Sequence, residues 1–325
     1  MAELNSLQAR VYSKLGQSGS IFGLSLLELA KENPEIIALT SDMASAAGLE
    51  RFKNTYPDRF FNVGIAEQNL VGIASGLSHE GYKPVITAQS AFLSMRSGEP
   101  IRQYLAYMKS NVIAVGIGAG FALNFFGNTH YAIEDIAIMR SIPNMTVLSP
   151  SDAGQAAKIF EAAVKLNTPV YIRLVGGTNC PIVYKEDYDL QIGKSILVKD
   201  GSDITIFATG IMVYNALKAA ESLEEKGISI KVVDVHTIKP LDTQIIRDSV
   251  LSRLFVSIEE HNIIGGLGGA VSEYLSEEGC AIPLLRLGVK DTFCKVGDYN
   301  YLLEQNRLTP ELLAEDILSK YQSTK

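Results

Sequence analysis

Short apolar runs alternate with amphipathic stretches along the first half of the chain. The runs are filled almost entirely by apolar residues and lie at 36–40, 84–88, 112–118, 145–149 and 170–175. Between them, apolar residues recur with helical spacing, which predicts helices over 21–32, 68–79, 100–108 and 152–166. Continuous apolar strands separated by helices are typical of a parallel sheet that is covered on both faces. We therefore predict an α/β domain over residues 1–180.

A second series of the same kind follows a change in composition. Residues 176–188 carry glycine, proline, asparagine and mixed charges, which are typical of a connecting segment, and we place the linker at 181–190. Beyond it, strands are predicted over 204–208, 228–235 and 255–258, and helices over 213–226, after Gly269 and over 310–321. Residues 191–325 should form a smaller α/β domain, so the predicted fold is two consecutive parallel-sheet α/β domains.

Composition and charge argue against several classes of protein. The net charge of −7 and the absence of a basic stripe argue against a nucleic-acid partner. Three cysteines without a CxxC pair argue against a disulfide framework or a zinc site. The longest apolar stretch, 112–126, contains three glycines and is shorter than the ~20 residues of a membrane helix. No secretory signal is visible, so we expect a cytoplasmic protein without membrane contact.

The most informative segment is 60–69, with the sequence FFNVGIAEQN. Glu67 follows a strand-like run and begins an apolar helix, so its carboxyl group should be partly buried. Burial disfavours the charged form, and such a carboxyl group is suited to exchange protons near neutral pH. From the residues alone, an acidic residue that stabilises the helix dipole is the alternative interpretation.

Residues 64–68, GIAEQ, resemble the glutamate motif of the thiamine-diphosphate enzymes of the transketolase family. The flanks PDRF at 57–60 and GYKP at 81–84 are especially similar to deoxyxylulose-phosphate synthase. The resemblance implies that Glu67 is catalytic and binds N1′ of the aminopyrimidine ring, where it promotes the tautomer that activates the cofactor. It also implies a pyrimidine-binding domain followed by a transketolase C-terminal domain.

The same resemblance suggests two further cofactor-binding residues. SAFL at 90–93 is similar to the family's Ser-Thr-Phe-Leu run, which makes Phe92 the candidate for the aromatic ring that packs on the aminopyrimidine. Asp42, which follows the strand at 36–40, is similar to an aspartate near the cofactor at the subunit interface. Core packing for Phe92 and turn formation for Asp42 are the alternatives.

Two residues are candidates for substrate binding through the resemblance. GNTH at 127–130 is similar to the family's Gly-x-Thr-His motif, which implies that His130 is catalytic and hydrogen-bonds to substrate oxygens. Arg173 is similar to an arginine that binds the terminal phosphate of sugar substrates, and the planar guanidinium suits an oxyanion. A structural ion pair is the alternative for Arg173.

Three positions depart from the family pattern. Phe126 stands in the substrate-binding region where the family usually has an aspartate. Gly118 and Ala119 stand where relatives carry a substrate-facing histidine and a second phosphate-binding arginine. We expect a less polar and less cationic substrate pocket than in those relatives.

The second domain is similar to the transketolase C-terminal domain at 232–242 and 257–269. The resemblance implies that the glycines at 265–269 serve close packing, and that His236 and His261 are structural or interfacial. The chain lacks the Gly-Asp-Gly and asparagine motif with which full-length relatives bind Mg²⁺ and the diphosphate; the text at 297–300 is not that motif. No metal ligands are expected in this chain, and an N-terminal transketolase subunit should supply the diphosphate and Mg²⁺ site.

The predicted function is that of one subunit of a thiamine-diphosphate-dependent transketolase, active only with its partner in an α₂β₂ complex. It would transfer a two-carbon ketol unit from a ketose, phosphorylated or otherwise anionic, to an aldehyde. One alternative is the β-subunit of a 2-oxoacid dehydrogenase, although THYA stands at 129–132 where those subunits usually read His-Ser-Gln. The others are a decarboxylating enzyme similar to deoxyxylulose-phosphate synthase and a non-catalytic assembly or regulatory subunit.

Overall fold

The apolar runs of the first half form one mostly parallel sheet in the computed structural model, which describes residues 4–324. Its strands from this half are β1 (Ile36–Thr40), β2 (Phe60–Asn62), β3 (Lys83–Gln89), β4 (Ile113–Ile117), β5 (Thr146–Leu148) and β6 (Val170–Leu174). They pair in parallel in the order β5-β6-β4-β3-β1-β2. Every residue of β1, β4 and β6 is buried, which accounts for the lack of polar alternation in their sequences.

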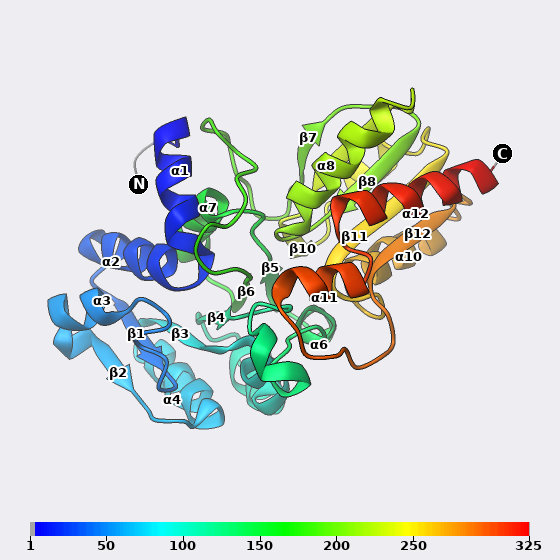
Figure 1. Cartoon of the computed structure of the whole chain (residues 1–325). Helices are drawn as coiled ribbons and strands as arrows, with labels where there is room; N and C mark the ends of the chain where they lie inside the picture. Colours follow the sequence, from blue (N-terminus) through cyan, green and yellow to red (C-terminus); the bar gives the residue numbers. More distant parts are fainter. Residues whose placement is uncertain (1–3, 325) are drawn as a thin grey trace.

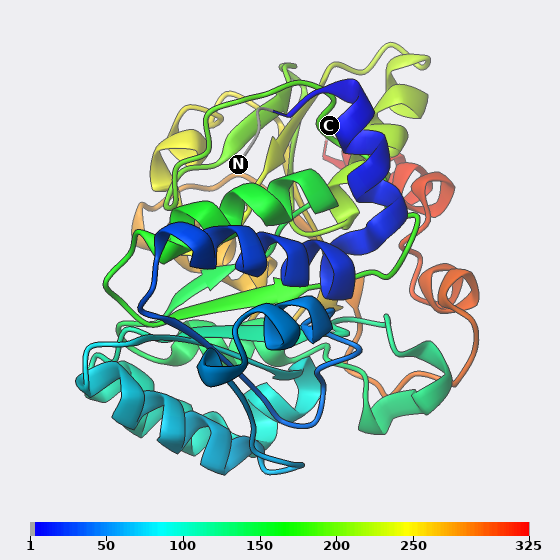
Figure 2. The same ribbon diagram turned by 90° about the vertical axis from the view of Figure 1, so that its left-hand side faces the viewer.

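Helices cover both faces of this sheet. One face carries α1 (Ser6–Leu15), α2 (Phe22–Glu32), α3 (Glu50–Thr55) and α7 (Ala153–Val164), and Figure 2 shows α1, α2 and α7 in front of the strands. The other face carries α4 (Glu67–His79), the π-type turns η3 (Phe92–Arg96) and η4 (Ile101–Tyr107), and α6 (Asp135–Ser141). The segment predicted as a helix over 100–108 therefore forms the π-helix η4, which follows the short α-helix α5 (Gly98–Pro100). Short connecting turns are η1 (Gly16–Ile21), η2 (Pro57–Arg59) and η5 (Asn124–Thr129).

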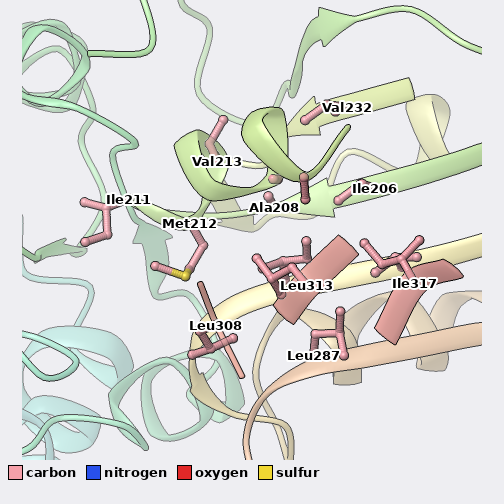
Figure 3. Packing of buried hydrophobic residues seen from close by; sticks show 14 of the residues in the cluster. Ile206, Ala208, Ile211, Met212, Val213, Val232, Leu287, Leu308, Leu313 and Ile317 are labelled. Atoms are coloured by element: carbon pink, nitrogen blue, oxygen red, sulfur yellow. The ribbon is translucent and has the colours of Figure 1, made fainter. Parts of the chain in front are cut away.

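The second domain contains a five-stranded sheet with the order β12-β11-β8-β9-β7. Its strands are β7 (Ile196–Lys199), β8 (Ile204–Ala208), β9 (Ile230–Asp234), β11 (Leu254–Asn262) and β12 (Leu284–Val289), and only the pairing of β7 with β9 is antiparallel among them. The helices are α8 (Met212–Glu224), α9 (Thr243–Arg247), α10 (Leu267–Glu277), α11 (Tyr299–Gln305) and α12 (Pro310–Ser323). Figure 3 shows Leu313 and Ile317 of α12 packed toward Ile206 and Ala208 of β8. The prediction of two consecutive α/β domains with mostly parallel sheets is confirmed.

The two domains share their cores, although they are distinct in Figure 1. Strand β10 (Thr237–Lys239) comes from the second half of the chain, yet it pairs antiparallel with β5 and forms the edge of the first domain's sheet. Phe207 and Phe255 of the second domain belong to the same buried cluster as Met139 and Val147 of the first. The two domains are therefore packed against each other through a shared core and a shared sheet.

Asp234, at the end of β9, anchors a second contact between the halves. Its carboxylate accepts hydrogen bonds from Gln155 Nε2 of α7 at 2.8 Å and from the Tyr184 hydroxyl of the connecting segment at 2.7 Å. Burial raises the pKa of Asp234 to about 7, although both hydrogen bonds oppose this shift. Between about pH 4 and pH 7, the Asp234 carboxyl group therefore keeps its proton in the folded protein, whereas an aspartate in the unfolded chain releases it.

We predict that Asp234→Asn removes one component of the pH dependence of stability. The wild-type contribution is fully present below about pH 4, the ordinary aspartate pKa, and is lost as the pH rises through about 7. Its limiting slope is about 1.4 kcal/mol per pH unit. Denaturant unfolding of both proteins between pH 5 and 8 measures this effect. The free energy of unfolding of wild type minus that of Asp234→Asn should fall as the pH rises and should level off above pH 7. Parallel curves for the two proteins would contradict the assignment.

Candidate active site

The predicted site residues follow the carboxyl ends of four neighbouring strands. Strands β4, β3, β1 and β2 lie side by side and run in parallel. Asp42 follows β1, Glu67 follows β2, Phe92 follows β3 and His130 lies in the loop after β4. Because the carboxyl ends of parallel strands meet at one edge of a sheet, the fold itself gathers these residues where α/β domains bind ligands.

Glu67 begins α4 as a buried carboxylate, with a side chain that is 4% exposed. Gly64, at a φ of 75°, turns the chain between β2 and the helix. Ser41 holds this turn because its hydroxyl donates to the Gly64 carbonyl at 2.9 Å and accepts from the Ala66 amide at 3.1 Å. Glu67 Oε2 accepts a hydrogen bond from Arg96 Nη1 at 2.8 Å, so the buried charge has a cationic partner.

Arg96 also contacts Phe92, four residues earlier on η3. Its guanidinium carbon lies 4.4 Å from the centroid of the Phe92 ring, a distance at which a cation is attracted to an aromatic face. The backbone carbonyl of Arg96 accepts from Gln68 Nε2 at 3.0 Å, which ties η3 to the start of α4. Arg96 belongs to none of the motifs noted in the sequence, but its spacing of four residues from Phe92 on a helical turn is a signal that the two side chains share a face.

His130 completes the group through two aromatic contacts. Its ring centroid lies 5.1 Å from that of Phe92, nearly edge-on at 68°, and 4.8 Å from that of Phe126 at 31°. Nδ1 of His130 is 2.9 Å from the Thr129 hydroxyl. The structure therefore brings together Glu67, Arg96, Phe92, His130 and Phe126, which we call the site cluster.

The second domain holds the loop that carries His130. Asn128 Nδ2 donates to the Cys294 carbonyl at 2.7 Å, and the Cys294 amide donates back to Asn128 Oδ1 at 3.0 Å. Next to this pair, Gly127 has a φ of 73°, and a Cβ there would lie 2.8 Å from a methyl carbon of Val296. The position of His130 thus depends on residues 294–296, which sequence reasoning did not single out.

Asp42 lies beside the approach to Glu67 rather than within the site cluster. Its backbone amide donates to Asn62 Oδ1 at 3.1 Å, and its carboxylate accepts from Asn62 Nδ2 at 3.0 Å. Asn62 Oδ1 also accepts from the Gly64 amide at 3.0 Å. Asp42 is exposed and has a φ of 57°, a conformation that aspartate adopts more readily than most residues. It therefore fixes the loop before Glu67 and leaves its carboxylate accessible.

Arg173 does not reach the site cluster. It lies within β6 opposite Gly116, and its side chain is 1% exposed. Nε donates to both carboxylate oxygens of Asp135 at 3.0 and 2.9 Å, and Nη2 donates to the carbonyls of Ala132 and Glu260 at 3.1 and 2.8 Å. In this structure Arg173 forms the structural ion pair that the sequence left open as the alternative to binding an anionic substrate.

Gly118 and the buried histidines have structural explanations. Gly118 has a φ of 69°, and a Cβ there would lie 2.9 Å from two side-chain carbons of Leu123, so a histidine would not fit this backbone.

Burial lowers the pKa of His236 and of His261 to about 4, so both are neutral at pH 7. His261 Nε2 accepts a hydrogen bond from the Ala137 amide across the domain junction.

Within residues 4–324, no group of three or more His, Cys, Asp or Glu side chains is placed to hold a metal ion. None of the helices in that same range is long and apolar enough to cross a bilayer.

Comparison with known proteins covers both domains. Residues 17–176 match the family model of the transketolase pyrimidine binding domain, and residues 193–312 match that of the transketolase C-terminal domain. The chain belongs to the transketolase family. The family prediction made from the glutamate motif is therefore confirmed.

Its relatives include separate subunits of similar length. The 6-deoxy-6-sulfo-D-fructose transketolase subunit of Clostridium sp. is 40% identical over 285 residues, which cover 87% of this chain and 88% of that protein. The solved structure of a split gene transketolase, an inactive β4 tetramer, has a TM-score of 0.86 and 40% identity, covering 94% of this chain and 98% of that one. The 1-deoxy-D-xylulose-5-phosphate synthase of Carboxydothermus hydrogenoformans is 36% identical over 304 residues, 92% of this chain but 49% of that enzyme. Similarity to a matching half of that synthase is thus confirmed.

We predict that Arg173→Gln lowers the free energy of unfolding by about 3–5 kcal/mol, because Asp135 would remain buried without its cation. Urea unfolding measures the loss, and Arg102→Gln, at an exposed position, should stay within about 0.5 kcal/mol of wild type. Adding Asp135→Asn should cost less than the sum of the two single changes. Strict additivity would show that the ion pair contributes nothing of its own.

Proposed function

We propose that this chain is the subunit of a split transketolase that binds the aminopyrimidine half of thiamine diphosphate. The observation that carries the proposal is the buried Glu67 at the start of α4, adjacent to the ring of Phe92 through Arg96. Burying a carboxylate to 4% exposure costs free energy, and Arg96 is the cationic partner that offsets this cost in the structure. Family membership supplies the cofactor class that suits such a group.

The site cluster fits an aminopyrimidine ring. Such a ring is planar, with an exocyclic amino group that donates and ring nitrogens that accept a hydrogen bond or carry a proton. It is therefore suited to a carboxyl group at its edge and a flat apolar surface on its face. The guanidinium of Arg96 is also planar with N–H donors, and it lies over Phe92 while donating to Glu67. The environment therefore accommodates a group of this shape and polarity.

The residues of this chain would have separate roles. Glu67 would exchange a hydrogen-bonded proton with the ring nitrogen, and Phe92 would pack on the ring face. Thr129 engages Nδ1 of His130, so a substrate oxygen would meet Nε2, which could hold or deliver a proton there. Bound thiamine diphosphate would supply the nucleophilic carbon and the electron sink for the two-carbon unit.

The reaction we propose moves a two-carbon ketol unit from a ketose to an aldehyde. A sulfo sugar and a sugar phosphate appear in the names of two relatives, which supports an anionic substrate. Because Arg173 is buried, the cation for that anion would come from another residue or from the partner subunit. Phe126 is 63% exposed beside His130 and would give this side of the pocket an apolar wall.

The chain would be active only with an N-terminal subunit that carries the Mg²⁺ and diphosphate site. The lack of a metal-binding group among residues 4–324 supports this division of labour, as does the inactive β4 state of the similar split transketolase. Exposed apolar side chains lie on the elements that adjoin α4, including Ile65 before α4, Met95 in η3 and Tyr107 in η4. They would be buried in an α₂β₂ complex, which we place in the cytoplasm.

We predict that Glu67→Gln lowers turnover of the reconstituted complex by at least ~10²-fold, because the amide keeps the shape but cannot exchange a proton. The exchange of the C2 proton of the bound cofactor, followed by NMR, should slow in parallel. Glu99→Gln, at an exposed position, is the matched control and should retain activity. Unchanged proton exchange in Glu67→Gln would remove this residue from cofactor activation.

We also predict that the isolated chain binds thiamine diphosphate weakly or not at all, even with Mg²⁺, because the diphosphate half of the site is elsewhere. Isothermal titration calorimetry of the chain alone and of the complex with its N-terminal partner measures the difference. Tight binding or ketol transfer by this chain alone would show that the split-site proposal is wrong.

A further inference from the structure

Arg96 contacts both residues with which the proposed site would hold the aminopyrimidine ring. Its Nη1 donates to Glu67 Oε2 at 2.8 Å, and its guanidinium lies 4.4 Å from the centroid of Phe92. These are the two contacts that the ring would make, one with the carboxylate and one with the aromatic face. A single side chain of this protein therefore satisfies both groups at once.

We propose that Arg96 is a latch that closes the cofactor-free site and must leave it when thiamine diphosphate binds. The inference rests on the proposed function and goes beyond it, because it assigns a role to a residue that no part of the proposed reaction uses. Arg96 would keep the buried Glu67 paired until the ring replaces it.

The hydrogen bond itself gives a second reason for the latch to open. Arg96 Nη1 donates to Glu67 Oε2 at 2.8 Å, so the ring nitrogen could not bind that oxygen while the guanidinium stays in place. The contact with Arg96 and the proposed contact with the ring are therefore alternatives at this oxygen.

The exposure of the two partners shows which one can move. Glu67 is 4% exposed and is fixed by the first turn of α4, whereas the Arg96 side chain is 46% exposed at the end of η3. The Arg96 backbone is held by the hydrogen bond from Gln68, so only the side chain needs to rotate. A guanidinium that rotates into water recovers its hydration, and half-exposed ion pairs contribute little net free energy.

The test is cofactor binding to the reconstituted two-subunit complex carrying Arg96→Gln. Removing the latch destabilises only the cofactor-free state, so the dissociation constant for thiamine diphosphate, measured by calorimetry with Mg²⁺, should fall by roughly 3- to 10-fold. Arg102→Gln, an exposed arginine six positions along the chain, should leave the constant unchanged.

Thermal unfolding of the same complexes distinguishes a latch from a merely structural arginine. Arg96→Gln should lower the melting temperature without cofactor and should match wild type when thiamine diphosphate is saturating. A dissociation constant that is unchanged or higher, or a melting temperature lowered equally in both states, would overturn the latch. Failure of the wild-type complex to bind the cofactor at all would instead overturn the proposed function and the latch with it.

Discussion

The buried guanidinium of Arg173 joins the two domains, because it pairs with Asp135 of the first and donates to the Glu260 carbonyl of the second. A fully buried guanidinium is stable only if nearby groups compensate its lost hydration. Here they come from α6, from the loop before it and from the Glu260 carbonyl in β11 of the second domain. Glu260 in turn accepts hydrogen bonds from the Phe121 amide and the Tyr299 hydroxyl. Arg173 thus hydrogen-bonds to groups of both domains. The loop that carries His130 is held at Phe121 by Glu260 and at Ala132 by Arg173 itself.

This arrangement explains how a domain without a residue of the site cluster still shapes the site. The loop between β4 and α6 is held near its start by Glu260 and near its middle by Cys294. His130 lies between these anchor points, and its ring completes the contacts with Phe92 and Phe126. Small displacements of the second domain should therefore alter the His130 side of the site cluster before they alter Glu67, whose contacts come from β1, the turn before α4 and η3 of the first domain.

Sequence reasoning succeeded where the signal was local. The apolar runs predicted the buried strands, and the segment around Glu67 contains its own turn glycine, helix start and carboxylate. It failed where the deciding partner is far along the chain. Arg173 reads as an anion-binding residue in isolation, but Asp135 and Glu260, 38 and 87 positions away, make it structural. Strand β10 escaped prediction for the same reason, because its partner β5 lies in the other domain.

Under the proposed division of the active site between two chains, the Glu67–Arg96 pair would let this subunit fold before its partner completes the site. A buried carboxylate without a partner destabilises the fold that contains it. In an enzyme whose halves are one polypeptide, the rest of the site can be present from the start. A subunit that folds separately would have to pair this charge with one of its own side chains, and in the proposal above that side chain must also be able to leave Glu67. Arg96 meets both requirements, because it pairs with Glu67 and remains half in contact with solvent.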